Sequence, residues 1–175
     1  SGWGRFVLNR TRAWAQRHRY TVTIRPYCND ILDHNISIGT WCIPRRVLEI
    51  LEEGEESCTE VLYLDGDAAI SRLDWTVPPL ADGERIRMAI HDENVSGCVS
   101  GCVVNSGAFL VRNDEPTRHM MRWWAAFGNR TCSKRAAFPE QVCAEKMRHK
   151  WKRYFHAVGH RALNTPVKVA GGAME

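Results

Sequence analysis

The chain has 175 residues, 44% of them apolar and 25% charged, a mixture that fits one compact globular domain and excludes a disordered or fibrous protein. Its net charge of +4 is spread along the sequence, and the signatures of nucleic-acid-binding modules are absent, so no nucleic-acid partner is expected. No apolar run is long enough to span a membrane, and residues 1–6 lack the layout of a signal peptide. Membrane attachment is therefore expected only through an anchor outside this chain.

Four short apolar runs, rich in β-branched and aromatic residues, predict β-strands. They cover residues 20–24, 60–64, 86–90 and 108–112. Segments with helical periodicity lie among them. This order predicts an α/β fold, with a mixed, mostly parallel sheet flanked by helices, in a single domain spanning residues 1–175.

Proline, capping residues and glycine mark the boundaries of the predicted helices. Pro44 is expected to open one helix and Gly54 to end it. Asn113 or Asp114 is expected to cap a second helix, whose core-facing stripe has the i, i+4, i+7 spacing. That stripe consists of Met120, Trp124 and Phe127 and ends before Gly128. A third helix is predicted from about residue 139 to residue 151.

The most informative stretch is an apolar strand followed by Asp65, Gly66 and Asp67. Open α/β sheets place ligands at the carboxyl ends of their strands. Residues two apart point to the same side of an extended chain, so the two carboxylates can converge on one ion, and Gly66 lets a ligand approach the backbone. Hard oxygen donors suit Mg²⁺ or Mn²⁺. The competing interpretation is a simple turn, because Asp and Gly both favour turns.

The cysteines and the glycosylation sequons bear on the cellular compartment. None of the seven cysteines forms a CxxC pair, which argues against a zinc ribbon or a thioredoxin-type site. Cys98 and Cys102 are expected to be disulfide-bonded or buried rather than metal-binding. Sequons begin at Asn9, Asn35, Asn94 and Asn129. They favour the lumen of the secretory pathway, where disulfides persist.

A series of short motifs runs in order from residue 9 to residue 166. They lie at residues 9–20, 41–44, 62–67, 104–113, 123–124, 140–141 and 156–161. The strongest are the apolar strand with Asp-Gly-Asp at 62–67 and the block Val-Asn-Ser-Gly-Ala-Phe-Leu-Val-Arg-Asn at 104–113. In this order the motifs resemble the GT-A nucleotide-sugar transferases, and most closely glycosyltransferase family 34, the Golgi galactosyl-, mannosyl- and xylosyltransferases.

The resemblance implies which side chains form the site. Mn²⁺ or Mg²⁺ is expected on Asp65, Asp67 and His156, with His160 as the rival for His156. The donor is expected on Asp65, Gly66, Asp67, Ser106, Gly107, Gly159 and Arg161. The catalytic and acceptor-site residues are expected to be Asn105, Glu140 and Gln141. Residues 91–93, His-Asp-Glu, are expected to form a polar loop rather than to touch sugar or metal.

Two departures from the family pattern stand out. Family members generally have an opening strand before the first helix, whereas this sequence begins almost at that helix. Either that strand lies upstream of residue 1, or nucleotide binding is compromised. The segment Trp41-Cys42-Ile43 matches the family's Trp-x-Lys element but lacks its lysine. Arg45 and Arg46 lie close by.

The resemblance implies a glycosyltransferase that moves a sugar from a UDP- or GDP-sugar to a glycan hydroxyl, with retention of configuration. It also implies a type II membrane protein of the Golgi or endoplasmic reticulum lumen. Inversion would instead need a carboxylate base, for which Glu140 is the candidate. Two alternatives stay open: a non-catalytic relative that binds glycan or nucleotide, and a phosphatase with Asp65 as its nucleophile.

Overall fold

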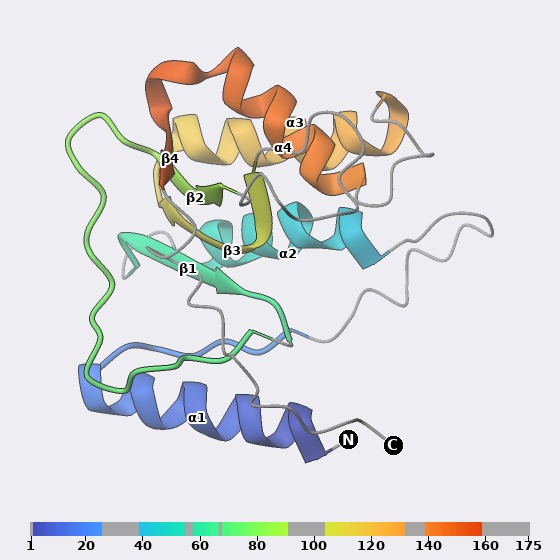
Figure 1. Ribbon diagram of the computed structural model, residues 1–175. Coiled ribbons are helices and arrows are strands. Elements are labelled where there is room, and N and C mark those ends of the chain that lie inside the picture. Colours follow the sequence, from blue (N-terminus) through green and yellow to red (C-terminus); the bar gives the residue numbers. More distant parts are fainter. Residues whose placement is uncertain are drawn as a thin grey trace.

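The computed structural model describes residues 2–25, 39–54, 58–66, 68–90, 104–131 and 139–158 (Figure 1). In chain order their elements are α1 (Gly2–His18), α2 (Gly39–Glu53), β1 (Glu60–Leu64), β2 (Ile86–Ile90), β3 (Val104–Arg112), α3 (Glu115–Thr131), α4 (Pro139–Lys150), η2 (Lys152–Tyr154) and β4 (Phe155–Val158). The strands predicted at 60–64, 86–90 and 108–112 are confirmed, the last as part of the longer β3.

The strands form one sheet in the order β1-β3-β2-β4. β3 pairs antiparallel with both β1 and β2, whereas β2 and β4 are parallel. β1, β2 and β4 therefore run in one direction, and β3 runs against them. The predicted mixed α/β class is confirmed. The described pairings are nevertheless not mostly parallel, because the one opposed strand lies inside the sheet and takes part in two of its three pairings.

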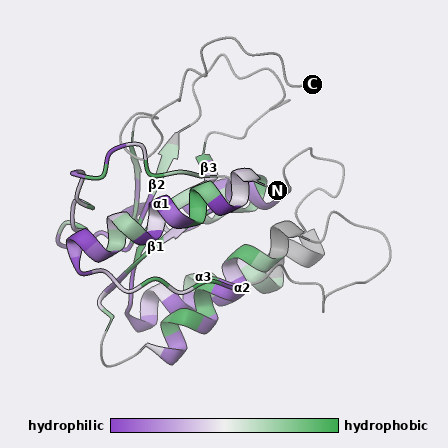
Figure 2. Cartoon of the chain, turned by 90° about the horizontal axis from the view of Figure 1, so that it is seen from below, coloured by the Kyte–Doolittle hydropathy of each residue, from purple (hydrophilic) through white to green (hydrophobic). Residues whose placement is uncertain are grey.

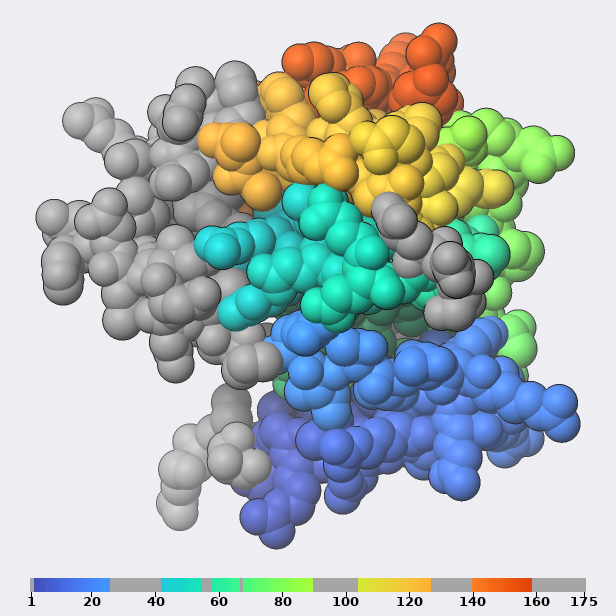
Figure 3. Space-filling model, turned by 180° about the vertical axis from the view of Figure 1, so that it is seen from behind, coloured from blue at the N-terminus to red at the C-terminus, as the bar shows by residue number. Residues whose placement is uncertain are grey.

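The sheet separates two apolar layers (Figure 1), and Figure 3 shows from behind that α3 and α2 lie above and α1 below. On one face α2, α3 and α4 cover the larger core, which is centred on Phe109 and Trp124. On the other face α1 packs through Trp14 against β1 and residues 70–77. Alternate residues of a strand point to opposite faces, and β1 follows this rule. Val61 and Tyr63 contact the first core, and Leu62 and Leu64 contact the second.

The strand predicted at residues 20–24 is wrong, because this segment forms neither helix nor strand. Arg19 has a left-handed backbone (φ 59°) that ends α1. The amides of Arg19 and Tyr20 donate to the carbonyls of Gln16 (3.3 Å) and Ala15 (2.8 Å), which is the Schellman pattern. The ring of Tyr20 then lies 4.9 Å from that of Trp14. The apolar residues after α1 therefore cover the helix instead of pairing with a strand.

The start of α2 also differs from the prediction. The helix begins at Gly39, so Pro44 lies inside it rather than opening it. The helix loses one backbone hydrogen bond at Pro44 and continues, because Val47 and Leu51 are fully buried and hold it in the core. Its end is as predicted: α2 stops at Glu53, and the amide of Gly54 donates to the carbonyl of Ile50 (3.0 Å).

The predicted cap of α3 is confirmed at Asp114. Its Oδ1 accepts from the backbone amide of Thr117 (3.0 Å), the reach expected from an N-cap. Met120 and Trp124 are buried as predicted, but α3 continues through Gly128 to Thr131. α4 matches the third predicted helix. In the described ranges, no helix has both the length and the apolar character that a membrane crossing needs.

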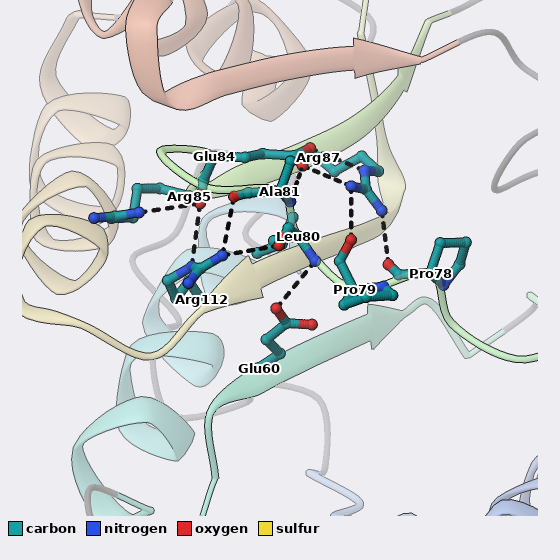
Figure 4. Close-up of polar contacts among 9 residues, drawn as sticks. All are labelled: Glu60, Pro78, Pro79, Leu80, Ala81, Glu84, Arg85, Arg87 and Arg112. Carbon is teal, nitrogen blue, oxygen red and sulfur yellow. Dashed lines mark hydrogen bonds and ion pairs between the residues drawn. The ribbon is translucent and has the colours of Figure 1, made fainter.

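Residues 68–85, the crossover segment, connect β1 to β2 and run across α1 (Figure 1). Side chains of α1 hold it, since Trp14 Nε1 donates to the carbonyl of Trp75 (2.7 Å) and Arg10 Nη2 to that of Ser71 (2.5 Å). The segment returns to the sheet where β1 and β2 begin, and two arginines fix it there (Figure 4). We call Glu84, Arg87 and Arg112 the amino-edge clamp.

Two of the described cysteines, Cys42 and Cys143, are disulfide-bonded and buried. Cys58 is the free thiol among the cysteines that the structure describes. Cys98 and Cys102 lie outside the described residues.

Candidate functional site

The carboxyl edge of the sheet is where the candidate site lies. β1, β2 and β4 run in the same direction, so their carboxyl ends and the start of the opposed β3 share this edge. The register of β2 against β3 shifts between Met88 and Ala89, from Phe109 to Asn105. The shift leaves residues 106–108 of β3 without a partner on β2, as in a β-bulge. Ser106 and Gly107 therefore lie at this edge without a pairing to β2.

Asp65 is fixed directly after β1. Its amide donates to the carbonyl of Gly107 (2.8 Å), and its carbonyl accepts from the amide of Ala68 (2.9 Å). The hydroxyl of Tyr63 donates to Asp65 Oδ1 (2.5 Å). A strand register, a turn and a side-chain hydrogen bond therefore set the direction of this carboxylate.

Gly107 lets the carboxylate of Asp65 lie against the backbone of β3. A Cβ added at Gly107 would stand 2.9 Å from Asp65 Oδ2 and 3.1 Å from Asn105 Oδ1. Any other residue would thus push aside two polar side chains. The amide of Gly107 donates to Asn105 Oδ1 (2.7 Å), which assigns the oxygen of that side chain to the backbone. The NH₂ group of Asn105 is left as the end that can donate to a ligand.

Glu140 enters the site from the first turn of α4. Its side chain is 4% exposed, and Oε2 is buried without a hydrogen-bond partner. Burial raises the pKa of the Glu140 carboxyl to about 7, and the nearby charge of Asp65 adds to the rise. Hydrogen bonds from its own backbone amide and from Ser106 act in the opposite direction. Two acidic groups thus face one another in a low-dielectric corner, and one of them titrates near neutral pH.

The structure therefore brings together five predicted site residues, Asp65, Asn105, Ser106, Gly107 and Glu140, which come from β1, β3 and α4. Gln141 is 7% exposed, so its side chain lies inside the protein. Gly66 is exposed, and no atom of the described chain stands within 4 Å of a Cβ added there. The predicted residues Asp67, Gly159 and Arg161, the rival ligand His160 and residues 91–93 lie outside the described residues.

His156 is not brought to Asp65. It lies on β4 and pairs in turn with Arg87, Leu110 and Leu62 across the sheet. β4 and β1 are three inter-strand spacings apart, roughly 14 Å, and Leu62 lies three residues, or about 10 Å, before Asp65. The exposed His156 side chain is too distant to share a cation with Asp65. The prediction that it is a metal ligand with Asp65 is therefore wrong.

Tyr63 is a site residue that the sequence analysis missed. Its ring stacks on Phe109 at 4.9 Å, which places its hydroxyl next to Asp65. The signal was present in the two-residue alternation of β1, because Tyr63 and Asp65 point to the same face. The apolar character of β1 hides this signal, because the Tyr63 ring is apolar and only its hydroxyl is polar.

The described donor atoms fit a hard divalent cation. Asp65 offers carboxylate oxygens at the mouth of the sheet edge, and the nearby acid Glu140 has an unpaired oxygen. A positive charge between them would relieve their repulsion. In the part of the chain that the structure describes, no group of three His, Cys, Asp or Glu residues could hold a metal, so a full protein ligand set is not assembled from it.

Comparisons with known proteins agree with the fold. No protein-family model matches the chain, and no curated protein sequence matches it. A solved structure, the crystal structure of a glycosyltransferase involved in the glycosylation of the major capsid of PBCV-1, is similar to it with a TM-score of 0.65. The likeness covers 90% of this chain and 76% of that one at 12% sequence identity. The chain thus has the fold of a glycosyltransferase structure.

Proposed function

We propose that this chain is a metal-dependent glycosyltransferase that moves a sugar from a nucleoside-diphosphate sugar to a glycan hydroxyl. One observation carries the proposal: within a glycosyltransferase-like fold, Asp65, Ser106, Gly107 and Glu140 meet at the carboxyl edge of the sheet. Ligands of open α/β sheets bind at this edge. Three of the motifs that resemble glycosyltransferase family 34, at residues 62–67, 104–113 and 140–141, supply these four residues, and membership of that family is part of the proposal.

Asp65 and Asp67 are the proposed protein ligands of Mn²⁺ or Mg²⁺, and His160 takes the place first given to His156. Such ions take one or two carboxylates and fill their other positions with water and phosphate oxygens. When bound, the cation would offset the negative charge of the departing diphosphate. In our assignment, Gly66, Gly159 and Arg161 bind the donor diphosphate.

Asn105 and Ser106 are proposed to orient the transferred sugar. The amide oxygen of Asn105 is held by the amide of Gly107, so its NH₂ group is directed by a fixed partner. Ser106 is 2% exposed and donates to Glu140, so its orientation is also set. Pre-set polar groups of this kind bind a ligand without losing conformational entropy at that moment.

Glu140 is proposed to form a hydrogen bond with the acceptor hydroxyl that receives the sugar. A carboxyl whose pKa is about 7 exists in both forms at neutral pH, so it can accept a hydrogen bond from the acceptor or donate one to it. With retention, the departing phosphate takes the acceptor proton and Glu140 only positions the hydroxyl. With inversion, Glu140 would take that proton. Product anomers, identified by proton NMR, separate the two roles, and we expect retention.

The compartment and the parent protein are also part of the proposal. Disulfide-bonded Cys42 and Cys143 and the four sequons support a lumen of the secretory pathway. A type II parent anchored in the Golgi or endoplasmic reticulum membrane would hold this chain in that lumen.

The test is thermal stabilisation by a panel of UDP- and GDP-sugars with and without Mn²⁺, followed by assay of glycan products. We expect one donor class to raise the melting temperature only when Mn²⁺ is present. Asp65→Asn should lose this shift and lower donor affinity roughly a hundredfold, the effect of removing one metal ligand worth about 3 kcal/mol. The matched control is Asp74→Asn, because Asp74 is 58% exposed and lies in the crossover segment.

The outcomes distinguish the competing functions. Metal-dependent donor binding without any transfer would identify a non-catalytic relative. Trapping of an aspartyl-phosphate on Asp65 would identify a phosphatase. Equal donor affinity in Asp65→Asn and the parent chain would refute the metal site.

A further inference from the structure

The segment that contains α1 carries an excess of positive charge. Residues 1–29 contain six arginines and no acidic residue. Arg10 binds carbonyls of the crossover segment, and Arg25 forms an ion pair with Glu53. Arg5, Arg12 and Arg17 are exposed on α1. One side of the molecule is therefore a cationic helix surface.

The same layer carries the exposed large apolar side chains. Within the described residues, the large hydrophobic side chains that are exposed are Trp3 (51%), Phe6 (50%), Tyr20 (39%) and Ile24 (52%). Trp3 and Phe6 stack on one another at 5.4 Å near the start of α1. Elsewhere in the described chain, aromatic rings are partly or fully covered, as Trp123 is under Lys150. An exposed stacked pair at one helix end is thus a local feature of α1.

The helical spacing gathers these groups on the outer side of α1. Val7, Trp14 and Ala15 are buried against the sheet. Phe6, Asn9, Ala13 and Gln16 recur at i, i+3, i+7 and i+10 and are all exposed, so they mark the opposite face. Arg5 and Arg12 flank this face. Figure 2 views α1 from that side and shows hydrophilic and hydrophobic residues next to one another along it.

We propose that the outer face of α1 docks on an anionic lipid bilayer, with Trp3 and Phe6 in the interface and Arg5, Arg12 and Arg17 on the lipid phosphates. Trp3 suits the boundary between water and hydrocarbon, because its ring is largely apolar and its indole N–H can donate to water, and Phe6 adds apolar area beside it. Arginine binds phosphate and is attracted by a negative membrane surface. The docking is peripheral and independent of the proposed catalysis.

A bilayer fits this face better than a soluble polyanion does. A soluble polyanion would pair with the guanidinium groups but would leave the stacked rings of Trp3 and Phe6 half-exposed to water. A bilayer interface meets both groups at once, and α1 forms an outer layer of the molecule that can lie flat on it (Figures 1 and 2). The sheet edge with Asp65 belongs to a different layer, so docking leaves the candidate site accessible.

The test is co-sedimentation of the whole chain with phosphatidylcholine vesicles, with and without about 30% phosphatidylserine, at roughly 0.1 M salt. An N-glycan on Asn9 would cover the docking face, so the proposed docking belongs to the chain without a glycan at Asn9, and the protein for this test comes from a bacterial host. We expect binding to the anionic vesicles and little to the neutral ones. The double variant Arg5→Gln/Arg12→Gln should weaken it roughly thirtyfold, since each basic residue near such a surface contributes roughly fivefold.

The second variant, Trp3→Ala/Phe6→Ala, tests the part of the proposal that concerns the bilayer. It should weaken vesicle binding at least tenfold while leaving the melting temperature within a few degrees. The matched control is Arg122→Gln/Arg153→Gln, which removes the same charge from α3 and η2 and should change binding less than twofold. Loss of binding in this control as well would overturn the proposal.

Three other results would also overturn it. If the aromatic variant binds as the parent does while the arginine variant fails, and heparin competes equally, the face is a polyanion site. If the parent chain is a dimer by light scattering and the aromatic variant a monomer, the face covers a second copy. Absence of binding to both kinds of vesicle would leave α1 as an ordinary solvated helix.

Discussion

The two edges of one sheet are built on opposite principles. At the amino edge, each side chain of the clamp has hydrogen-bond partners. Arg87 donates to both carboxylate oxygens of Glu84 (2.9 and 2.6 Å) and to the carbonyls of Pro78 (2.7 Å) and Pro79 (3.0 Å). Arg112 donates to the carbonyls of Glu84, Leu80 and Ala81. Figure 4 shows these contacts converging on the end of the crossover segment.

At the carboxyl edge, one buried acidic oxygen has no hydrogen-bond partner. Glu140 Oε2 is buried without a partner, and the charge of Asp65 acts on the same corner. Leaving a buried polar atom unpaired costs about 1–3 kcal/mol. A fold tolerates that cost where the atom serves a ligand, and it completes its hydrogen bonds where the role is structural. The comparison therefore distinguishes a structural edge, the amino-edge clamp, from a ligand-binding edge in the same four-stranded sheet.

The largest expected effect is a loss of stability when the amino-edge clamp is broken. Arg87→Met should lower the free energy of unfolding by about 3–5 kcal/mol, because it leaves Glu84 buried and unpaired. The side chains of Arg87 and Glu84 are only 13% and 8% exposed. Urea denaturation measures the loss. The control Arg72→Met breaks an ion pair whose partners are 72% and 58% exposed and should leave the free energy of unfolding nearly unchanged. If both variants lost the same free energy of unfolding, the amino-edge clamp would have no special structural role.

The next prediction concerns the glycine under Asp65. Gly107→Ala should weaken Mn²⁺ binding by up to roughly a hundredfold, since the new methyl group displaces the carboxylate oxygen that lies 2.9 Å from its position. Isothermal titration calorimetry measures the affinity. Gly66→Ala is the matched control, because its methyl group meets no described atom within 4 Å. Gly66→Ala should keep the parent's affinity for Mn²⁺ and lower only the affinity for the donor sugar. Identical Mn²⁺ affinities in both variants would show that Gly107 does not position Asp65.

Much of the site was predictable from local sequence. Apolar residues running into Asp65 identified a strand end, and Asn105 to Gly107 identified the start of another, because strand patterns and glycine are local signals. Glu140 was predicted through the resemblance of residues 140–141 to a motif of the family. The register shift at Met88 and Ala89 was not predictable, since it depends on which strand lies beside β3.

The errors have the same origin. His156 matched a motif by its spacing in the sequence, but the strand order puts two strands between β4 and β1. Residues 20–24 have strand composition, yet the Schellman turn at Arg19 directs them over α1. The raised pKa of Glu140 also cannot be predicted from the sequence, because burial of the first turn of α4 causes it. Long-range pairing and burial decide these cases, and neither is written in a short window of sequence.

A smaller effect follows from the pKa of Glu140. Its value of about 7 in the fold lies above the ordinary 4.5, so the folded protein holds this proton more tightly than the unfolded chain does. The resulting stability is complete below about pH 4.5 and is lost as the pH rises to 7. Glu140→Gln, measured in EDTA, should therefore raise the melting temperature by a few degrees at pH 8 and leave it unchanged at pH 4.5. Glu53→Gln, at a side chain 62% exposed, should show no such pH dependence. A gain for Glu140→Gln that is equal at both pH values would contradict the assignment.

The smallest expected effect belongs to Tyr63. Tyr63→Phe removes the hydroxyl that donates to Asp65 Oδ1 but keeps the ring stacked on Phe109, so the fold should be unchanged. Mn²⁺ affinity should fall roughly threefold to tenfold, near the lower limit for partners of a metal ligand, because Gly107 still holds the backbone of Asp65. Tyr154→Phe, far from this edge on η2, is the control and should have no effect. A gain in affinity would mean that the hydroxyl competes with the cation for the same oxygen. An unchanged affinity would mean that the backbone of β3 alone directs Asp65, and the carboxyl edge would then need only its glycine to present the carboxylate.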